Sequence, residues 1–367
     1  MSTAIDEYTS TGAKFWHHPD ALEGLRTNDP HPVVTHIMPT DICNHKCAFC
    51  SVQTRDGDTL TMEQIREYLD QLIPLGLKAV IISGGGNPIL YKYFNDLVNY
   101  IHFKGLKIGL ITNGMPLKDY DGRKSWKNVL PATLDKLTWV RISMSGFDHE
   151  ENEVYVPDID KSKTTLGFSY VYHDAYIVPE EPHHGKVSTE YDLLQLGLRA
   201  VRVVHGIARI DELTMRIADM VRTHTPRYVR LLPNCLEPSL IESRCTELQK
   251  MADFIDPRVV FVQYKPPAAP SACYLGYLHP VLNTDGYVYP CDSCVLNRTA
   301  NHKFAEPWRM CRWDKIGEVY NLPVHSLVDA PRLCPGCVFT KSNNLLIDIV
   351  NGRELESPSP VEHPDFV

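Results

Sequence analysis

The sequence predicts an α/β protein with a parallel sheet, followed by a smaller cysteine-rich module. Two observations predict the sheet. Short apolar runs alternate with longer amphipathic segments between residues 33 and 232, and these runs are continuous, as in strands buried on both faces. The module is predicted because the chain changes after residue 256 to loops rich in Pro and Cys. With 367 residues, 43% of them hydrophobic, the chain can form one large domain and a smaller one.

Bulk composition excludes several classes of protein. The net charge is -8 and no long basic run occurs, so nucleic acid is not expected as a partner. No stretch reaches the roughly 18 to 20 apolar residues that span a bilayer, and residues 1–29 lack the apolar core of a secretion signal. We therefore expect a cytoplasmic protein in a reducing compartment, where its eleven cysteines bind metal or do redox chemistry.

The periodicity predicts the elements in order. Residues 1–32 form an N-terminal arm and residues 346–367 a C-terminal tail, and Thr61 is the expected N-cap of the first helix after the first strand. Strands are expected at 33–38, 78–83, 106–112, 138–143 and 228–232, and helices at 61–75, 91–104, 129–137 and 210–223.

The stretch 147–198 interrupts this alternation, because it is rich in Tyr, His and Pro. Two runs, 166–172 and 198–204, both have the pattern of a fifth strand. The second lies at the better distance from its following helix, which would make 147–198 an insertion. The large domain is then expected over 33–256 and the cysteine-rich module over 257–345.

Three cysteines follow the first strand with the spacing CxxxCxxC: Cys43, Cys47 and Cys50. Three thiolates can hold three irons of a 4Fe–4S cubane and leave the fourth iron open for a chelating ligand. A structural zinc site is the alternative, since CxxC pairs are common there. His45 could supply a zinc ligand, although its place inside the loop makes a tetrahedron awkward to close.

This cysteine pattern, with an aromatic residue before the last cysteine, resembles the signature of the radical SAM superfamily. Further similarities follow in order between about 33 and 234. The turn 83–88 (SGGGNP) resembles the family's GGE motif, with Asn87 where Glu is usual. The segments 112–114 (TNG) and 141–146 (RISMSG) also match, with Ser145 in place of a frequent Asp. The resemblance implies a partial (βα)6 TIM-like barrel.

The resemblance also implies the cofactors and their contacts. The three cysteines would hold a 4Fe–4S cluster whose open iron chelates S-adenosylmethionine (SAM). Reductive cleavage of SAM would give a 5′-deoxyadenosyl radical that abstracts hydrogen from an unactivated C–H bond. The implied SAM-binding residues are Ser83, Gly84, Gly85, Gly86, Asn87, Asn113, Ser143 and Arg230. The sequence identifies no catalytic acid or base.

The last third of the chain holds a second group of cysteines that resembles the SPASM/twitch extension of radical SAM enzymes. Fewer cysteines are present than in a full SPASM domain, so the resemblance implies one auxiliary 4Fe–4S cluster. Its expected ligands are Cys273, Cys291, Cys334 and Cys337. Cys294 and Cys311 are possible further ligands, and structural zinc is the alternative. The run 283–289 (NTDGYVY) predicts a hairpin that brings Cys273 and Cys291 together.

The remaining candidates point to ordinary roles. Cys235 and Cys245 lie outside both cysteine groups, and the pairs His17–His18 and His183–His184 are expected at the surface. Residues 170–174 (YVYHD) could line a substrate pocket or simply end a strand.

Two substrate classes are compatible with the resemblance. Many SPASM/twitch enzymes modify a ribosomally made precursor peptide, which favours natural-product maturation. Because only 42 residues precede Cys43, a fused leader-binding domain is not expected, and a separate leader-peptide recognition protein would be needed. The alternative is a tailoring enzyme for a sugar, aminocyclitol or nucleoside. A flavodoxin- or ferredoxin-like electron donor is expected in either case. A non-catalytic scaffold would leave the SAM motifs unexplained.

Overall fold

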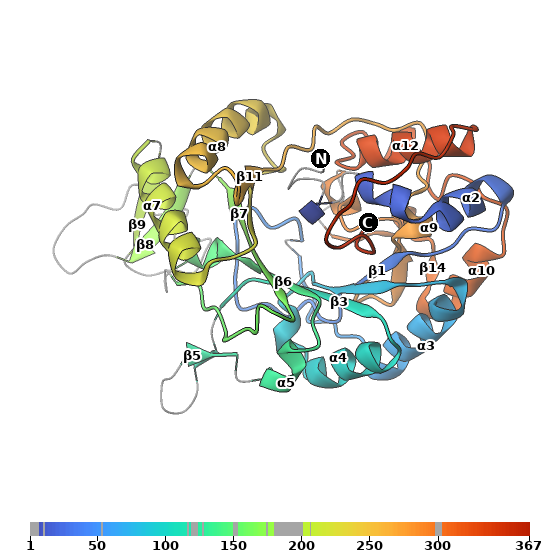
Figure 1. The fold of residues 1–367 in the computed structure, drawn as a ribbon, viewed down its shortest axis with the longest axis horizontal. Coiled ribbons are helices and arrows are strands. Elements are labelled where there is room, and N and C mark those ends of the chain that lie inside the picture. Colours follow the sequence, from blue (N-terminus) through green and yellow to red (C-terminus); the bar gives the residue numbers. More distant parts are fainter. Residues whose placement is uncertain are drawn as a thin grey trace.

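The fold was analysed in a computed structural model, shown in Figure 1. It describes residues 7–9, 12–52, 54–115, 117–118, 124–126, 128–149, 153–173, 175–179, 201–205, 207–297 and 303–367. An open ten-stranded sheet runs through the molecule in the order β11-β10-β7-β6-β3-β2-β1-β12-β13-β14. The strands from β11 to β12 are parallel, and β13 and β14 continue the sheet antiparallel. This open sheet is consistent with a partial TIM-like barrel.

The strands of this sheet are short and mostly buried. Their bounds are β1 Val34–Ile37, β2 Ala79–Ile82, β3 Lys107–Thr112, β6 Trp139–Ser143, β7 Thr165–Tyr172, β10 Tyr228–Pro233, β11 Val260–Val262, β12 Val281–Leu282, β13 Tyr287–Tyr289 and β14 Cys311–Arg312. Two small antiparallel pairs stand apart, β4 Leu117–Lys118 with β5 Lys124–Ser125, and β8 Ala175–Pro179 with β9 Val201–His205.

The helices expected at 61–75, 91–104, 129–137 and 210–223 are present, and the structure adds several that the sequence did not predict. Their bounds are α2 Pro19–Thr27, α3 Met62–Leu72, α4 Phe94–Phe103, α5 Pro131–Leu134, α7 Ile207–His224, α8 Ile241–Ile255, α9 Leu275–Leu278, α10 Ile316–Tyr320, α11 Ala330–Leu333 and α12 Thr340–Val350. In α3, Thr61 forms the predicted N-cap as part of a capping box with Gln64. The buried Ile65, Tyr68 and Leu72 recur at helical spacing, which fixes the face of α3 that meets the sheet.

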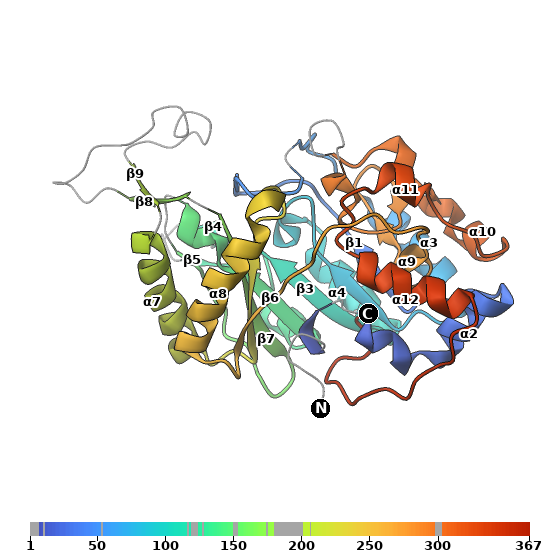
Figure 2. The ribbon, with the colours of Figure 1, turned by 90° about the horizontal axis from the view of Figure 1, so that it is seen from above.

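The fifth strand of the parallel series is β7, which lies between β6 and β10. Of the two candidate runs, 166–172 therefore forms the fifth strand, and 198–204 does not. Its carboxyl part, β9, pairs with β8 in a separate hairpin, which stands at the edge of the molecule (Figure 2). The distance to the next helix was misleading, because this hairpin stands in the crossover between β7 and α7. The burial of β7 on both faces is the better signal of a central strand.

The cysteine-rich part of the chain continues the same sheet. Strand β11, although it follows residue 256, pairs with β10, and β12 pairs in parallel with β1. The predicted hairpin forms between β12 and β13, and Gly286 turns it with a φ of 76°, a conformation that favours glycine. In both views α9, α10 and α12 lie at the opposite end of the molecule from α7 (Figures 1 and 2).

The N-terminal and C-terminal segments contact each other at the amino ends of the strands. Tyr8 donates a hydrogen bond to Glu362, which also pairs with Arg227 just before β10. The ammonium of Lys14 donates to the carbonyl of Phe366 over 3.0 Å, and the Phe366 ring packs edge-on against Trp139 of β6. The N-terminal arm and the C-terminal tail therefore close the amino end of the strands. No helix in the described part of the chain has the length and apolar character that crossing a membrane requires.

Candidate active site

The first cysteine group lies in the loop after β1, at the carboxyl end of the parallel strands. Cys50 raises the pKa of Cys43, and burial together with Cys43 and Cys50 raises the pKa of the Cys47 thiol well above its ordinary range. Three thiols gathered in this way gain by binding a cationic metal centre, which stabilises the thiolate form. The donor set therefore fits a cluster with three protein ligands.

The glycine turn after β2 is fixed to this cysteine loop through backbone contacts. The Gly86 amide donates to the Thr40 carbonyl over 3.2 Å, and the Asn87 amide donates to the Ile42 carbonyl over 2.9 Å. A Cβ at Gly86 would lie 2.1 Å from the Ile42 carbonyl oxygen, so only glycine fits. The turn and the cysteine loop therefore form one rigid unit.

Asn87 is held in a buried polar network rather than pointing to solvent. Its amide nitrogen donates to Asn113 over 2.8 Å and to Asn44 over 3.2 Å, while its amide oxygen accepts from Thr112 over 2.8 Å. Asn113 also donates to Asn44 and, over 3.8 Å, to the sulfur of Cys43. This network joins the ends of β2 and β3 to the cysteine loop, so Asn87 and Asn113 lie beside the three thiols.

Ser143 and Arg230 lie in one row across the inner face of the sheet. Both residues pair with Ser169 of β7, from its two sides. Ser143 accepts a bond from the Ser145 amide over 3.4 Å, whereas Arg230 reaches into the interior and donates to Gln263 over 2.9 Å. Ser83 is buried at the end of β2. The roles of these residues toward SAM stay predictions.

The second cysteine group forms a separate buried site. Cys273, Cys291, Cys334 and Cys337 line one small cavity. Burial raises the pKa of Cys273 well above its ordinary range, and the other three thiols raise it further. Trp308 donates to the sulfur of Cys334 over 3.4 Å. The four predicted auxiliary ligands are therefore brought together.

The two possible further ligands differ in position. Cys294 contacts Cys291, raising the pKa of that thiol, and is fully buried one turn later in the chain. Cys311 lies on β14, where burial and the nearby Asp314 raise the pKa of its thiol to about 12. The structure brings Cys294, but not Cys311, to the edge of the second site.

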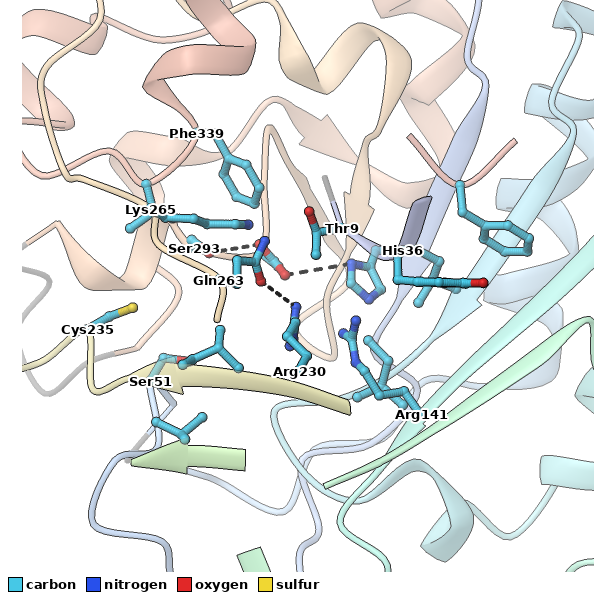
Figure 3. A pocket seen from close by; sticks show the side chains of 18 of the residues that line it. Thr9, His36, Ser51, Arg141, Arg230, Cys235, Gln263, Lys265, Ser293 and Phe339 are labelled. Carbon is cyan, nitrogen blue, oxygen red and sulfur yellow. Dashed lines mark hydrogen bonds and ion pairs between the residues drawn. The ribbon is translucent and has the colours of Figure 1, made fainter. Parts of the chain in front are cut away.

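A cavity of about 290 Å³ occupies the interior of the sheet between the two cysteine sites. Phe49 and Ser51, the neighbours of Cys50, line it on one side. Ser293 and Phe339, which follow Cys291 and Cys337, line it on the other. The side chains of Arg141, Arg230 and Lys265 project into it (Figure 3). A molecule in this cavity would lie between both sites.

Residues 37–165 match the family described as the radical SAM superfamily. The match contains the cysteine loop, the glycine turn and β6, which are the elements that form the site. The chain contains a radical SAM domain. The radical SAM domain is the type that binds a 4Fe–4S cluster and SAM, and the three thiols of the cysteine loop fit that cluster.

Several curated proteins are similar to parts of this radical SAM protein. An S-adenosylmethionine-dependent nucleotide dehydratase of Selenomonas ruminantium is 36% identical over 75 residues, which are 20% of this chain and 27% of that protein. An Fe-coproporphyrin III synthase of Methanosarcina barkeri is 32% identical over 132 residues, 35% and 31% of the two chains. A GTP 3′,8-cyclase of a Synechocystis species is 34% identical over 108 residues, 28% and 33% of the two chains. The matches thus span at most about a third of these relatives.

Solved structures with a similar fold include Streptococcus suis SuiB bound to its precursor peptide SuiA. That chain is 12% identical, with a TM-score of 0.49, and the alignment covers 100% of this chain and 84% of SuiB. Another is anSMEcpe with bound AdoMet and a peptide, at 15% identity and a TM-score of 0.48, covering 87% and 99% of the two chains.

Sequence analysis of the radical SAM domain missed Arg55, which lies beside the cysteine loop. Its guanidinium donates to the sulfur of Cys50 over 3.0 Å, to the Gly85 carbonyl over 2.7 Å and to the His45 carbonyl over 3.3 Å. One cation thus joins the cysteine loop to the glycine turn. No local pattern marks Arg55, because its partners are brought together only by the fold.

We expect Arg55→Met to lower the midpoint potential of the cluster by tens of millivolts, since a cation beside a ligand sulfur stabilises the reduced cluster. Arg55→Lys keeps the charge and should retain most of the potential. A redox titration followed by electron paramagnetic resonance measures both variants. An unchanged potential in a Met variant with its full iron content would contradict this role.

Two histidines also surround Cys47. The His149 ring lies 3.3 Å from the Cys47 sulfur and stacks on His45 with the ring centroids 3.9 Å apart. Ligand atoms of His45, Cys47 and His149 lie within 4.8 Å of one another. Burial and His149 lower the pKa of His45 to about 3, so this ring is neutral. The zinc alternative therefore has a specific ligand group, which metal analysis can test.

Proposed function

We propose that this protein cleaves SAM reductively and uses the resulting radical to abstract hydrogen from a substrate in the central cavity. The observation that carries the proposal is the rigid unit of cysteine loop and glycine turn at one side of that cavity. When bound, the cluster supplies one electron to SAM, which then breaks to methionine and a 5′-deoxyadenosyl radical. The work of this chain is to hold, orient and enclose the reactants.

Different residues of the chain hold the cluster, orient SAM and enclose the reactants. Cys43, Cys47 and Cys50 hold the cluster, and the backbone of the turn 84–86 binds the amino group of SAM. Asn113 and Ser143 supply the polar contacts around its methionine and ribose portions. Apolar side chains such as Ile81 and Ile111 line the cavity and help to exclude solvent and side reactions.

The second cysteine site suggests an auxiliary 4Fe–4S cluster held by Cys273, Cys291, Cys334 and Cys337. Two observations support this role. The four thiols face one small cavity, and their chain neighbours line the large one. A cluster there is close enough to bind the substrate or to exchange an electron with it.

Two substrate classes follow from these features. A small metabolite is favoured by the size and charge of the cavity, which suits one compact polar molecule. A precursor peptide is the second candidate, favoured by the auxiliary cysteine site that many peptide-modifying relatives of this type carry. A separate leader-binding protein belongs to the peptide proposal only. A flavodoxin- or ferredoxin-like protein would serve as electron donor for either.

The wild-type protein tests the proposed chemistry directly. After anaerobic reconstitution with iron and sulfide, dithionite and SAM should yield 5′-deoxyadenosine and methionine in equal amounts, measured by liquid chromatography with mass spectrometry. Omitting the reductant is the control. Absence of 5′-deoxyadenosine from a preparation with full iron content would refute the proposal.

Metal content tests the two cysteine sites. Two cubanes predict about eight irons per chain, and the triple Ala variant of Cys43, Cys47 and Cys50 should keep about half. Elemental analysis beside sulfide determination measures this. One zinc with about four irons would contradict a second cluster, and about twelve irons would add a third one involving Cys294. Zinc lost together with His149 in a His149→Ala variant would instead identify the histidine group as its site.

A further inference from the structure

The central cavity contains an excess of buried positive charge. Arg141 of β6, Arg230 of β10 and Lys265 after β11 all line it, and Figure 3 shows their side chains converging from the sheet. The facing carboxylate is Asp292, which accepts a hydrogen bond from the Ser293 hydroxyl over 2.9 Å and lies 3.9 Å from the His36 ring. Lys14 and Glu7 lie at the closed end and offset each other. Three cations against one carboxylate therefore leave about two net positive charges.

These cations have no carboxylate within ion-pair distance in the described part of the chain. Arg230 donates to the neutral amide of Gln263, and the Lys265 ammonium lies 4.2 Å from the centre of the Phe339 ring. Burial and the facing Arg141 lower the pKa of Arg230 to about 9, and burial lowers that of Lys265 to about 8. Two guanidinium groups held together without an anion are unfavourable in the free protein.

Several buried nitrogens around these cations also lack partners. Among the described residues, the Nε atoms of Arg141 and Arg230, the Nε2 of Gln263 and both ring nitrogens of His36 make no hydrogen bond. Gln263 is only 2% exposed and His36 only 5%. Buried donors are normally satisfied, so a group that brings several acceptor oxygens is the natural complement.

SAM does not supply that complement. Its carboxylate is balanced by its own ammonium, and its sulfonium leaves the molecule with a net positive charge. A second, anionic molecule is needed to neutralise the cavity. Among common biological anions, a phosphate monoester carries nearly two negative charges and three acceptor oxygens, which a single carboxylate does not.

We propose that the substrate is a small phosphorylated molecule whose phosphate is bound by Arg141, Arg230 and Lys265, with Gln263 as a further donor. This inference rests on the proposed function for the reaction that follows binding. It assigns Arg230 to the substrate in place of the SAM contact that the family resemblance implies. The aromatic rings of Phe49 and Phe339 line the same cavity and leave an apolar surface for the rest of the molecule. The phosphate then fixes the substrate between the two cysteine sites.

Calorimetry on the anaerobically reconstituted full chain tests the binding site. Ribose 5-phosphate is the test ligand, and ribose, which lacks the phosphate group, is the neutral control ligand. We expect the wild type to bind the phosphate ester at least tenfold more tightly than ribose. Arg230→Met should weaken ribose 5-phosphate at least tenfold, and Arg230→Lys much less. Arg222→Met, on an exposed part of α7 with a side chain 82% accessible, is the matched control.

Folding and SAM binding are measured on the same proteins. Since Arg230→Met removes an unfavourable buried charge, its melting temperature without ligand should equal or exceed that of the wild type, and ribose 5-phosphate should no longer raise it. Equal affinities for ribose and its phosphate would overturn the inference. So would a loss of SAM affinity in Arg230→Met as large as the loss for the phosphate, or a loss of iron from that variant.

The two proposals fail separately. A wild type that releases 5′-deoxyadenosine but binds ribose 5-phosphate no better than ribose overturns the phosphate site alone. A wild type that binds the phosphate through Arg230 but never cleaves SAM supports the site and refutes the proposed reaction.

Discussion

Cys47→Ala should abolish SAM cleavage, lowering 5′-deoxyadenosine formation at least about a thousandfold. Burial and the neighbouring thiols Cys43 and Cys50 raise the pKa of Cys47, so Cys47 lies close to both in the loop after β1. Losing it leaves two protein ligands for the cluster, which then has no rigid attachment beside the glycine turn. Chromatographic quantification of 5′-deoxyadenosine in reconstituted protein measures the effect.

The matched control is Cys245→Ala. Cys245 lies on α8, outside both cysteine sites, and is partly buried. The control loses a thiol and the same atoms, so it should keep its iron and its SAM cleavage. Undiminished cleavage in Cys47→Ala would refute the assignment of this loop to the cluster.

Cys334→Ala should uncouple the two halves of the reaction. We expect product formation from the true substrate to fall at least about a hundredfold, while 5′-deoxyadenosine is still released. The reason is the position of the second cysteine site, which borders the substrate cavity and lies apart from the cysteine loop. Iron should fall from about eight to about four per chain.

Folding must be measured beside activity for this variant, because a metal-dependent segment can unfold when its metal is lost. Here β12, β13 and β14 belong to the main sheet, so the variant has structure to retain. Circular dichroism and soluble yield report on this. A folded Cys334→Ala protein with half its iron and normal product formation would show that the second cluster is only a scaffold.

Much of the fold could be predicted because its signals are local. The strands β1, β2, β3, β6 and β10 are short runs rich in apolar residues, and the Thr61 capping box marks the start of α3. The fifth strand could not be predicted from spacing, because the hairpin of β8 and β9 separates β7 from the next helix. The pairing of β12 with β1 could not be predicted either, since the two strands are short and lie more than 200 residues apart in the sequence.

The candidate site likewise contains residues that the sequence predicts and residues that only the fold identifies. The cysteines and the glycine turn have fixed spacings that chemistry requires, so they are visible in one sequence. Arg55, His149 and Lys265 have no such spacing, and their importance depends on what the fold places beside them. Arg230 could be selected from its position on a predicted strand. Its place in a positively charged cavity could not be predicted, because the second guanidinium, that of Arg141, comes from another strand.

The contacts between the N-terminal and C-terminal segments, at the amino ends of the strands, affect the order in which parts of the cavity form during folding. The closed end of the cavity is made partly by Tyr8 and Lys14 and partly by His363 and Phe366, so its two halves are separated by about 350 residues of chain. During synthesis on a ribosome, the strands can pair and the cysteine loop can form while the interior is still open below. Contacts over such distances form late and slowly. We therefore expect this end of the cavity to close late in folding, when residues 363–366 pack against residues 8–14.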